Sequence, residues 1–211
     1  MRKQPTQLRA KARVDRILDA TDAAIAEGGV ANVTMNDLAI RAGVPIGSVY
    51  QYFSKKDEIL TSLCERHYEA LGAQLDDYFK DVRSIADFTR DVRATLNLCW
   101  NYTQKNPGYR ALSTDPNAWA VMREADWQDS LLNARRMADV LQSFVPFVPD
   151  EHTLAFCAIV CDSASSTARF ASRFEAMRDA LFDQFVEMVE SRIYTLLRED
   201  TSLQRKVEIA K

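Results

Sequence analysis

The sequence contains little of what strands, metal sites or membrane spans require. Glycine occurs six times and histidine twice among 211 residues, and no stretch shows the sustained period-2 alternation of a half-buried strand. No apolar run approaches the ~18 residues that a membrane span needs. The basic N-terminus lacks the apolar stretch of a secretory signal. We therefore expect an all-α, cytoplasmic protein.

The cysteines are few and scattered, at positions 64, 99, 157 and 161. They form no CxxC pair, so the sequence predicts neither a zinc site nor a disulfide framework, and no cofactor is expected. Cys157 and Cys161 are four residues apart and would share one face of a helix. We interpret them as buried thiols that pack as small apolar groups. The alternative is a redox-sensing pair.

Charge is divided unevenly along the chain. The net charge is −3, yet residues 1–56 carry a balance of +4 and the remainder carries −7. A basic module joined to an acidic body is typical of a protein whose N-terminal part meets nucleic-acid phosphates. The basic residues of this module are Arg2, Lys3, Arg9, Lys11, Arg13, Arg16, Arg41, Lys55 and Lys56.

Apolar residues recur at helical spacing nearly throughout the chain. A first amphipathic helix carries its apolar side from Val14 to Ile25 and ends at Gly28–Gly29. A second begins at Thr34, with Asp37 completing a variant capping box, and a third short helix ends near Phe53. Ser54 with Asp57 repeats the start signal for a long fourth helix. Further helices are predicted near 85–105, 117–144, 150–173 and 175–199, about nine in all, and the last dozen residues are expected to fray.

Three short helices followed by a long one is the layout of a helix-turn-helix module. Gly43 permits the positive φ of a tight turn, and Val44 and Val49 lie where the second and third helices must pack together. An inward Val49 places Gly47 and Gln51 on the outward face. That face carries hydrogen-bonding groups without charge, and a glutamine can pair with adenine in the major groove.

The segment Thr34–Lys56, continuing into Asp-Glu-Ile-Leu, resembles the DNA-binding signature of the TetR (tetracycline-repressor) family. The resemblance covers about 50 residues and includes Ala-Gly-Val, Tyr-Gln-Tyr-Phe and the lysines that follow. It implies a helix-turn-helix domain over residues 1–56, ordered over 10–56. It also implies a larger helical domain for ligand binding and dimerisation over 57–211.

The resemblance also implies a role for single positions. Thr34 and Met35 would meet phosphate and Asn36 a base, whereas Lys56 would anchor the backbone. Many members carry Ser or Thr where Pro45 stands, so a hydroxyl contact is missing there. Bases would face Pro45, Ile46, Gly47 and Gln51, and phosphates would be fixed mostly by Ser48, Tyr50 and Tyr52.

Aromatic residues are dense in the middle helices. With methionines as adaptable fillers they could line a cavity for an apolar or aromatic small molecule, although each ring is more commonly a core residue. Asp115 and Asp162 are interpreted as solvated carboxylates rather than as partners of a cationic ligand. The candidate ligand-binding residues are Trp100, Tyr109, Trp119, Met122, Trp127 and Phe156.

The last two helices combine small residues with surplus apolar surface, which predicts a homodimer. We therefore expect a repressor that a small-molecule effector releases from a palindromic operator in double-stranded DNA. The alternative is a nucleoid-organising or division protein of the same fold without an inducer. An enzyme is not expected, because no GxSxG, P-loop or Rossmann glycine pattern occurs and neither histidine follows a Glu by three residues.

Overall fold

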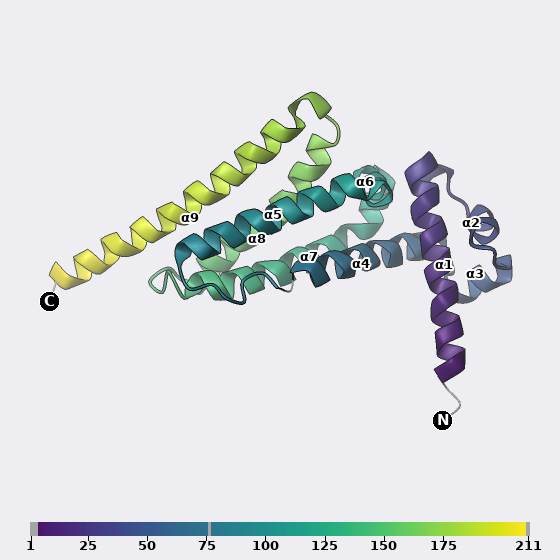
Figure 1. Ribbon diagram of the computed structural model, residues 1–211, viewed down its shortest axis with the longest axis horizontal. Helices are drawn as coiled ribbons and strands as arrows, with labels where there is room; N and C mark the ends of the chain where they lie inside the picture. Colours follow the sequence, from purple (N-terminus) through teal and green to yellow (C-terminus); the bar gives the residue numbers. More distant parts are fainter. Residues whose placement is uncertain (1–3, 76, 210–211) are drawn as a thin grey trace. The chain divides into compact units, whose positions relative to one another are not determined.

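The computed structural model describes residues 4–75 and 77–209, with side chains for 8–75 and 77–198. Arg2 and Lys3 lie outside the described residues, as do the last two positions of the segment expected to fray. Within the described part the chain is helical without strands, as predicted (Figure 1). The α-helices are α1 (Gln4–Gly28), α2 (Met35–Ala42), α3 (Ile46–Tyr52), α4 (Lys56–Leu75), α5 (Ile85–Lys105), α6 (Pro107–Thr114), α7 (Pro116–Gln142), α8 (Asp150–Ala171) and α9 (Arg178–Ile209), with 3-10 turns at Val30–Asn32 and Glu175–Met177.

The helices are grouped into two compact units that do not follow the chain in order. The N-terminal unit comprises Met1–Ala70 and Thr103–Ala125, and the C-terminal unit comprises Leu71–Tyr102 and Asp126–Lys211. The N-terminal unit therefore includes α6 and the first part of α7, in addition to the helix-turn-helix segment. The domain boundary after residue 56 stays a prediction.

The core of the N-terminal unit joins residues from both of its segments. Ile17 of α1, Leu38 of α2 and Val49 of α3 are fully buried. Leu112 and Met122, 37 and 47 residues beyond the end of α4 at Leu75, belong to the same apolar cluster and are also fully buried. Residues of α6 and α7 thus complete the core on which the helix-turn-helix rests.

Polar contacts fasten α1 within this unit. The Asp22 carboxylate lies 3.2 Å from Nε2 of His67 on α4, and the His67 ring packs against Tyr109 of α6 with centroids 5.0 Å apart. Gly108 is so close to Asp22 that a Cβ there would lie 1.9 Å from the Asp22 Oδ1 atom and 2.7 Å from its backbone oxygen. Position 108 therefore requires glycine for space, because α6 begins directly against α1.

The core of the C-terminal unit is built from α5, α7, α8 and α9. Phe88, Leu141 and Ile193 are fully buried in it. Trp100 of α5 stacks on Phe182 of α9 with ring centroids 4.7 Å apart. Two hydrogen bonds of 2.7 and 2.6 Å from Arg93 of α5 to Glu190 of α9 join residues that are far apart in the sequence.

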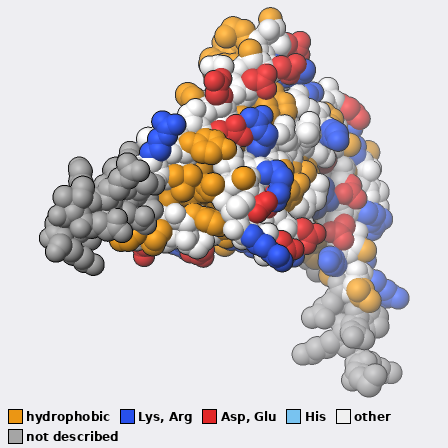
Figure 2. Space-filling view, turned by 60° about the vertical axis from the view of Figure 1, so that its left-hand side comes forward, with side chains coloured by type: hydrophobic (Ala, Val, Ile, Leu, Met, Phe, Trp, Pro, Cys, Tyr) orange, Lys and Arg blue, Asp and Glu red, His pale blue; other side chains and the backbone are white. Residues whose placement is uncertain are grey.

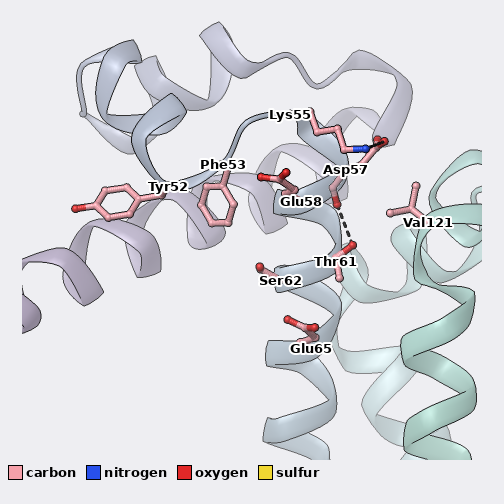
Figure 3. Close-up of a pocket in the computed structure, with 9 residues that line it drawn as sticks. All are labelled: Tyr52, Phe53, Lys55, Asp57, Glu58, Thr61, Ser62, Glu65 and Val121. Carbon is pink, nitrogen blue, oxygen red and sulfur yellow. Dashed lines mark hydrogen bonds and ion pairs between the residues drawn. The ribbon is translucent and has the colours of Figure 1, made fainter.

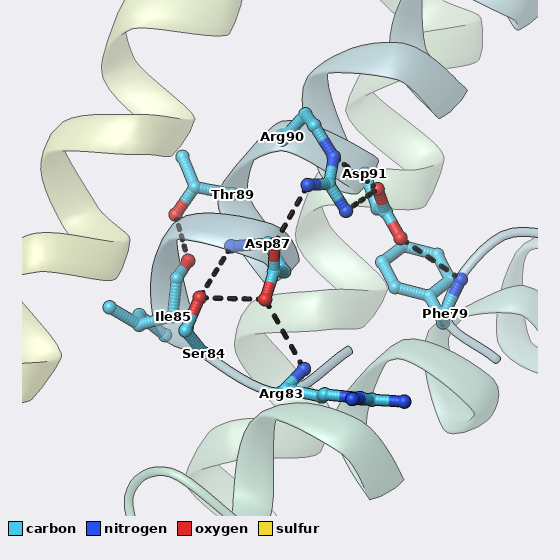
Figure 4. Close-up of polar contacts among 8 residues, drawn as sticks. All are labelled: Phe79, Arg83, Ser84, Ile85, Asp87, Thr89, Arg90 and Asp91. Carbon is cyan, nitrogen blue, oxygen red and sulfur yellow. Dashed lines mark hydrogen bonds and ion pairs between the residues drawn. The ribbon is translucent and has the colours of Figure 1, made fainter. Parts of the chain in front are cut away.

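The connection before α5 is held by carboxylates of α5 itself (Figure 4). The Ser84 hydroxyl accepts from the backbone N–H of Asp87 at 3.1 Å and donates to its carboxylate at 2.7 Å, which is a capping box. Phe79 adopts a positive φ of 67°. Its N–H donates to Asp91 at 3.3 Å and its ring packs against Phe88, so these contacts hold an unfavourable backbone conformation.

Several helix bounds differ from the prediction. Helix α1 begins at Gln4 rather than at the predicted ordered start near residue 10, and α9 continues to Ile209 through most of the segment expected to fray. Pro107 sits in the first turn of α6, where its missing N–H leaves no hydrogen bond unmade. Within the described residues, no helix combines the length and the apolar character that crossing a membrane requires.

Candidate nucleic-acid interface

The turn between α2 and α3 depends on Gly43. Its φ of 62° and ψ of 39° are left-handed, and its N–H donates to the Ile40 carbonyl at 3.2 Å. A Cβ at this position would meet no atom within 4 Å, so glycine is needed here for its backbone freedom rather than for space. The sequence-based prediction of a positive φ at Gly43 is confirmed.

Helix α3 separates an inner from an outer side as its sequence predicts. Val49 is fully buried and Val44 is buried beside it. Gly47 and Gln51 are exposed, and Tyr50 keeps 55 % of its surface. The remaining predicted DNA-contacting positions of this segment, Pro45 and Ile46, are exposed, and Ser48 is half-buried. The outer side is therefore a continuous, uncharged and accessible surface.

The beginning of α2 is fixed by its N-cap. The Thr34 hydroxyl accepts from the Asp37 N–H at 3.2 Å and donates to the Asp37 carboxylate, which confirms the predicted capping box. Met35 is half-buried and Asn36 is exposed. Ile40, one turn beyond Asn36, keeps 70 % of its surface. Sequence analysis did not single out Ile40, although its four-residue spacing from Asn36 is the signal for a shared face.

The start signal predicted for α4 involves a different acid. Both the backbone N–H and the hydroxyl of Ser54 donate to the Glu58 carboxylate, at 2.7 and 2.6 Å, and the hydroxyl bond above all lowers the pKa of Glu58. Asp57 instead lies 3.5 Å from Lys55, so its assignment as partner of Ser54 was wrong. Helix α4 begins two residues after Ser54, which brings the acid at i+4 rather than i+3 within reach.

Two further predicted positions lie at the end of α3 and the start of α4. Tyr52 is half-buried and packs against the core of the N-terminal unit. Lys56 is half-buried, and its ammonium donates to the Val30 carbonyl at 3.2 Å. One backbone bond leaves an ammonium further protons for an anion.

An open groove of about 570 Å³ lies beside α4 in the same unit. Glu58, Ser62 and Glu65 follow one another along one side of α4 (Figure 3). Three carboxylates line the groove together with a single lysine, Lys55. Phosphate would be repelled here, so the part of α4 that lines this groove is not suited to contact nucleic acid.

The predicted ligand-binding residues are divided between the two units. Tyr109, Trp119 and Met122 belong to the N-terminal unit, where Met122 is a core residue. Trp100, Trp127 and Phe156 belong to the C-terminal unit. Their environments differ too, since Trp100 stacks on Phe182 and Phe156 lines a surface groove, while Trp127 is 49 % exposed.

The structure also shows the surroundings of Asp115 and of the cysteines, which the sequence analysis singled out. Asp115 accepts the N–H groups of Asn117 and Ala118 at 2.9 and 3.0 Å, and so caps α7. All four cysteines are free thiols. Burial raises the pKa of both Cys99 and Cys161 to about 12, and that of Cys157 also rises. These thiols stay protonated at neutral pH, which makes them poor nucleophiles.

The helix-turn-helix segment matches a known family. A family model described as "Bacterial regulatory proteins, tetR family" matches residues 17–63. An uncharacterized HTH-type transcriptional regulator of Haemophilus influenzae is 32 % identical over 93 residues, which are 44 % of this chain and 48 % of that protein. The HTH-type transcriptional repressor KstR of Mycolicibacterium smegmatis is 42 % identical over 64 residues, 30 % of this chain and 31 % of KstR.

A third relative bears on the alternative function. The nucleoid occlusion factor SlmA of Glaesserella parasuis is 30 % identical over 109 residues, which cover 52 % of this chain and 49 % of SlmA. Each of these three matches thus spans about half or less of the curated relative.

Solved structures share the fold over nearly the whole chain. A SmeT–triclosan complex superposes with a TM-score of 0.63 at 19 % identity, covering 86 % of this chain and 91 % of SmeT. RolR in complex with resorcinol gives a TM-score of 0.61 at 14 % identity, covering 90 % of this chain and 95 % of RolR. At these identities the likeness concerns the fold alone.

Proposed function

We propose, on the match of residues 17–63 to the TetR family, that the chain is a TetR-family transcriptional regulator and a cytoplasmic repressor that a small molecule releases from a palindromic operator. The observation that carries the proposal is the outer side of α3. It is exposed and uncharged, and it is fixed by the buried Val49 and the left-handed Gly43. An uncharged helix face can approach base edges without stripping water from ions.

The bases are read from the exposed side of α3 and from two positions of α2. Gln51 pairs with adenine in the major groove, and Gly47 lets the helix approach the groove floor. Asn36 and Ile40 add an amide and an apolar group from α2, and Ile40 suits the methyl group of thymine. Phosphates are held by Thr34, the Met35 N–H, Ser48, Tyr50, Tyr52 and Lys56.

A second copy of the chain covers the apolar face of α8 and α9. A groove of about 660 Å³ in this face is lined by Phe156, Ile159, Leu181 and Met188, among others. The side chains of Ile159 and Met188 are 65 % and 64 % exposed, which is a large exposure for two apolar residues that line the same groove. Figure 2 shows hydrophobic side chains reaching the surface next to the described end of α9. A two-fold dimer also suits a palindromic operator.

The effector is an apolar or aromatic small molecule. The ring-rich middle helices support this class, with Trp100, Tyr109, Trp119, Met122, Trp127 and Phe156 as the candidates. Two proteins of the same fold bind aromatic molecules, resorcinol in RolR and triclosan in SmeT. Release follows when the effector prefers a conformation with weak operator affinity, because it then shifts the population away from the DNA-bound state.

The likeness to SlmA keeps one alternative open, a DNA-binding protein of nucleoid occlusion without an inducer. The two functions differ in where they bind. A repressor prefers an operator near the genes that it controls, whereas a nucleoid protein occupies many dispersed sites. The identity to SlmA covers about half of each chain, so we rank this function second.

Binding to DNA from upstream of the chain's own coding sequence is the direct test. Fluorescence anisotropy with excess competitor should give nanomolar affinity. Gln51→Ala and Tyr50→Ala should weaken it, whereas Asn101→Ala, an exposed amide in the C-terminal unit, should not. Wild-type binding that competitor abolishes and that neither variant changes would contradict the proposal.

Oligomeric state tests the dimer. Ile159→Glu and Met188→Glu should convert the dimer to monomers in sedimentation experiments, because the interface cannot solvate the new charge. Leu132→Glu is the matched control, since Leu132 of α7 is 50 % exposed and does not line the groove. Equal behaviour of the three variants would argue against this interface.

A further inference from the structure

Helix α1 carries arginines on one side only. Arg9, Arg13 and Arg16 follow one another at intervals of four and three residues, so all three lie within about 60° of one another around the helix axis. All three side chains are exposed. We call these three residues the arginine stripe. Lys11 is exposed too, but lies on nearly the opposite side of the helix.

The acidic residues of α1 have partners inside the N-terminal unit. Asp19 pairs with Arg66 of α4 at 2.7 Å, and Glu27 pairs with Arg41 of α2 at 2.8 Å. Asp22 contacts His67 of α4 at 3.2 Å. The carboxylates of α1 thus hold α2 and α4.

The arginine stripe has no such partner. Among the described side chains, none forms an ion pair with Arg9, Arg13 or Arg16. In contrast, Arg93 of the C-terminal unit is engaged by the Glu190 carboxylate. Like charges at i, i+4 disfavour the helix that carries them. Repulsion within the stripe therefore destabilises α1 when no partner is bound, and an anionic partner would offset this repulsion.

We propose that the arginine stripe contacts the DNA phosphate backbone, as a second binding surface that is independent of sequence and separate from α3. This inference rests on the proposed DNA-binding function. The stripe belongs to the same compact unit as α2 and α3. Figure 1 shows α1 running beside both helices and continuing past them toward the N-terminus. A cationic segment in that place lies within reach of the duplex that α3 reads.

The geometry of the stripe suits phosphates better than a lipid surface. Successive arginines are about 6 and 4.5 Å apart along the helix axis, so their long side chains can reach separate phosphates. Guanidinium groups also bind phosphate oxygens with two parallel hydrogen bonds. A membrane-surface helix needs an exposed apolar face opposite its charges, but the apolar residues of α1 away from the stripe, Val14 and Leu18, pack in the core of the N-terminal unit.

The salt dependence of binding to a duplex of unrelated sequence tests the stripe without requiring a known operator. Each lost phosphate contact should reduce the slope of log K against log salt by about 1. We expect Arg13→Ala to lower the slope by that amount for each bound chain, and the triple Arg9, Arg13 and Arg16 alanine variant by about three times as much. Arg13→Lys should restore most of the slope, because the charge is kept.

Two controls separate this inference from the proposed function. Lys11→Ala removes one charge from the other side of the same helix and should change the slope by clearly less than Arg13→Ala. Gln51→Ala should reduce the preference for the operator and leave the slope unchanged. Melting curves and circular dichroism should show an intact helix in every variant.

Each outcome is decisive for one statement or the other. Equal slopes for Arg13→Ala, Lys11→Ala and the wild type would overturn the proposed phosphate contact of the stripe, even where the operator is recognised. In another outcome, the wild type prefers no operator while the arginine variants still reduce the slope of log K against log salt. That result would keep the phosphate contact of the stripe and refute the proposed regulator. Arginine variants that lose binding to anionic phosphatidylserine vesicles, while their DNA slope is unchanged, would assign the stripe to a membrane and overturn its assignment to DNA.

Discussion

In the N-terminal unit, polar contacts hold α1 against helices that are distant in sequence, and the exposed side of α3 is uncharged and includes Tyr50 and Gln51. In the C-terminal unit, α8 and α9 expose Ile159 and Met188 along an apolar groove. The first surface suits the duplex of the proposed function. The second suits the proposed second copy of the chain. The comparison indicates that each unit exposes side chains whose chemistry matches that of its proposed partner.

Truncating a core methionine should give the largest effect on stability. Met122 is fully buried in the N-terminal unit, so Met122→Ala should lower the free energy of unfolding by about 2–5 kcal/mol. Trp127→Ala in the C-terminal unit should cost about 1 kcal/mol or less, because its side chain is half exposed. Urea denaturation measures both. Equal losses would mean that the two predicted ligand residues have similar surroundings.

Adding one methyl group where α6 meets α1 should have the next largest effect. Gly108→Ala places a Cβ against Asp22, so we expect a loss of roughly 1–3 kcal/mol in unfolding free energy. Gly72→Ala on α4 is the control, because a Cβ there meets no atom within 4 Å, and it should gain about 0.5–1 kcal/mol. A Gly108→Ala protein as stable as wild type would show that α6 does not press on α1.

The pH dependence of stability should distinguish two carboxylates of the C-terminal unit. Burial, followed by the nearby Asp126 charge, raises the pKa of Asp129 to about 6. The stabilisation from its neutral form is complete below the unfolded pKa near ~4 and is lost as pH rises through about 6. Asp129→Asn should therefore lose less stability than wild type between these pH values, by roughly 1–3 kcal/mol. Urea denaturation across a pH series measures the difference.

Asp87 is the control of opposite sign. The Ser84 hydroxyl bond, followed by that from Arg90, lowers the pKa of Asp87. Its contribution is present above the unfolded pKa and is lost as pH falls through the folded value. Asp87→Asn should remove this contribution, so that stability is lower than in the wild type at neutral pH and falls less steeply on the acid side. The same curve for both variants would contradict the assignment of either pKa shift.

Removing a helix cap should have the smallest effect and should be similar in the two units. Thr34 caps α2 and Ser84 caps α5 with the same pair of hydrogen bonds. Thr34→Ala and Ser84→Ala should each cost about 1 kcal/mol. Thermal unfolding compares them, and Ser143→Ala serves as a hydroxyl control beyond the end of α7. A much larger loss at Thr34 would indicate that its hydroxyl supports the whole helix-turn-helix.

Local signals in the sequence predicted the helix-turn-helix well. Gly43 and the pair Thr34 and Asp37 act through residues at most four positions apart, so their pattern can be read directly. Glu58 was missed because the reach of a carboxylate to Ser54 depends on where α4 begins, which a residue pattern specifies only to within one or two positions. The DNA contacts of these residues stay predictions.

Tertiary contacts explain what the sequence did not predict. Met122 belongs to one apolar cluster with residues of α1, α2, α3 and α4, a grouping that no local residue pattern specifies, and its place in a ligand cavity stays a prediction. The sequence predicted order from residue 10, whereas α1 begins at Gln4. The side chains of Leu8, Arg9 and Lys11 are exposed, so this end of the helix has no apolar pattern by which the sequence could reveal it.

The discontinuity of the N-terminal unit also has a consequence for the nascent chain. The ribosome completes α1–α4 well before it makes Leu112 and Met122, which close the same core. At about 5–20 residues per second, the 55 residues from Ala70 to Ala125 take roughly 3–11 s. During this interval the helix-turn-helix emerges with part of its apolar core uncovered, and it becomes complete only after α5, which belongs to the other unit, has been synthesised.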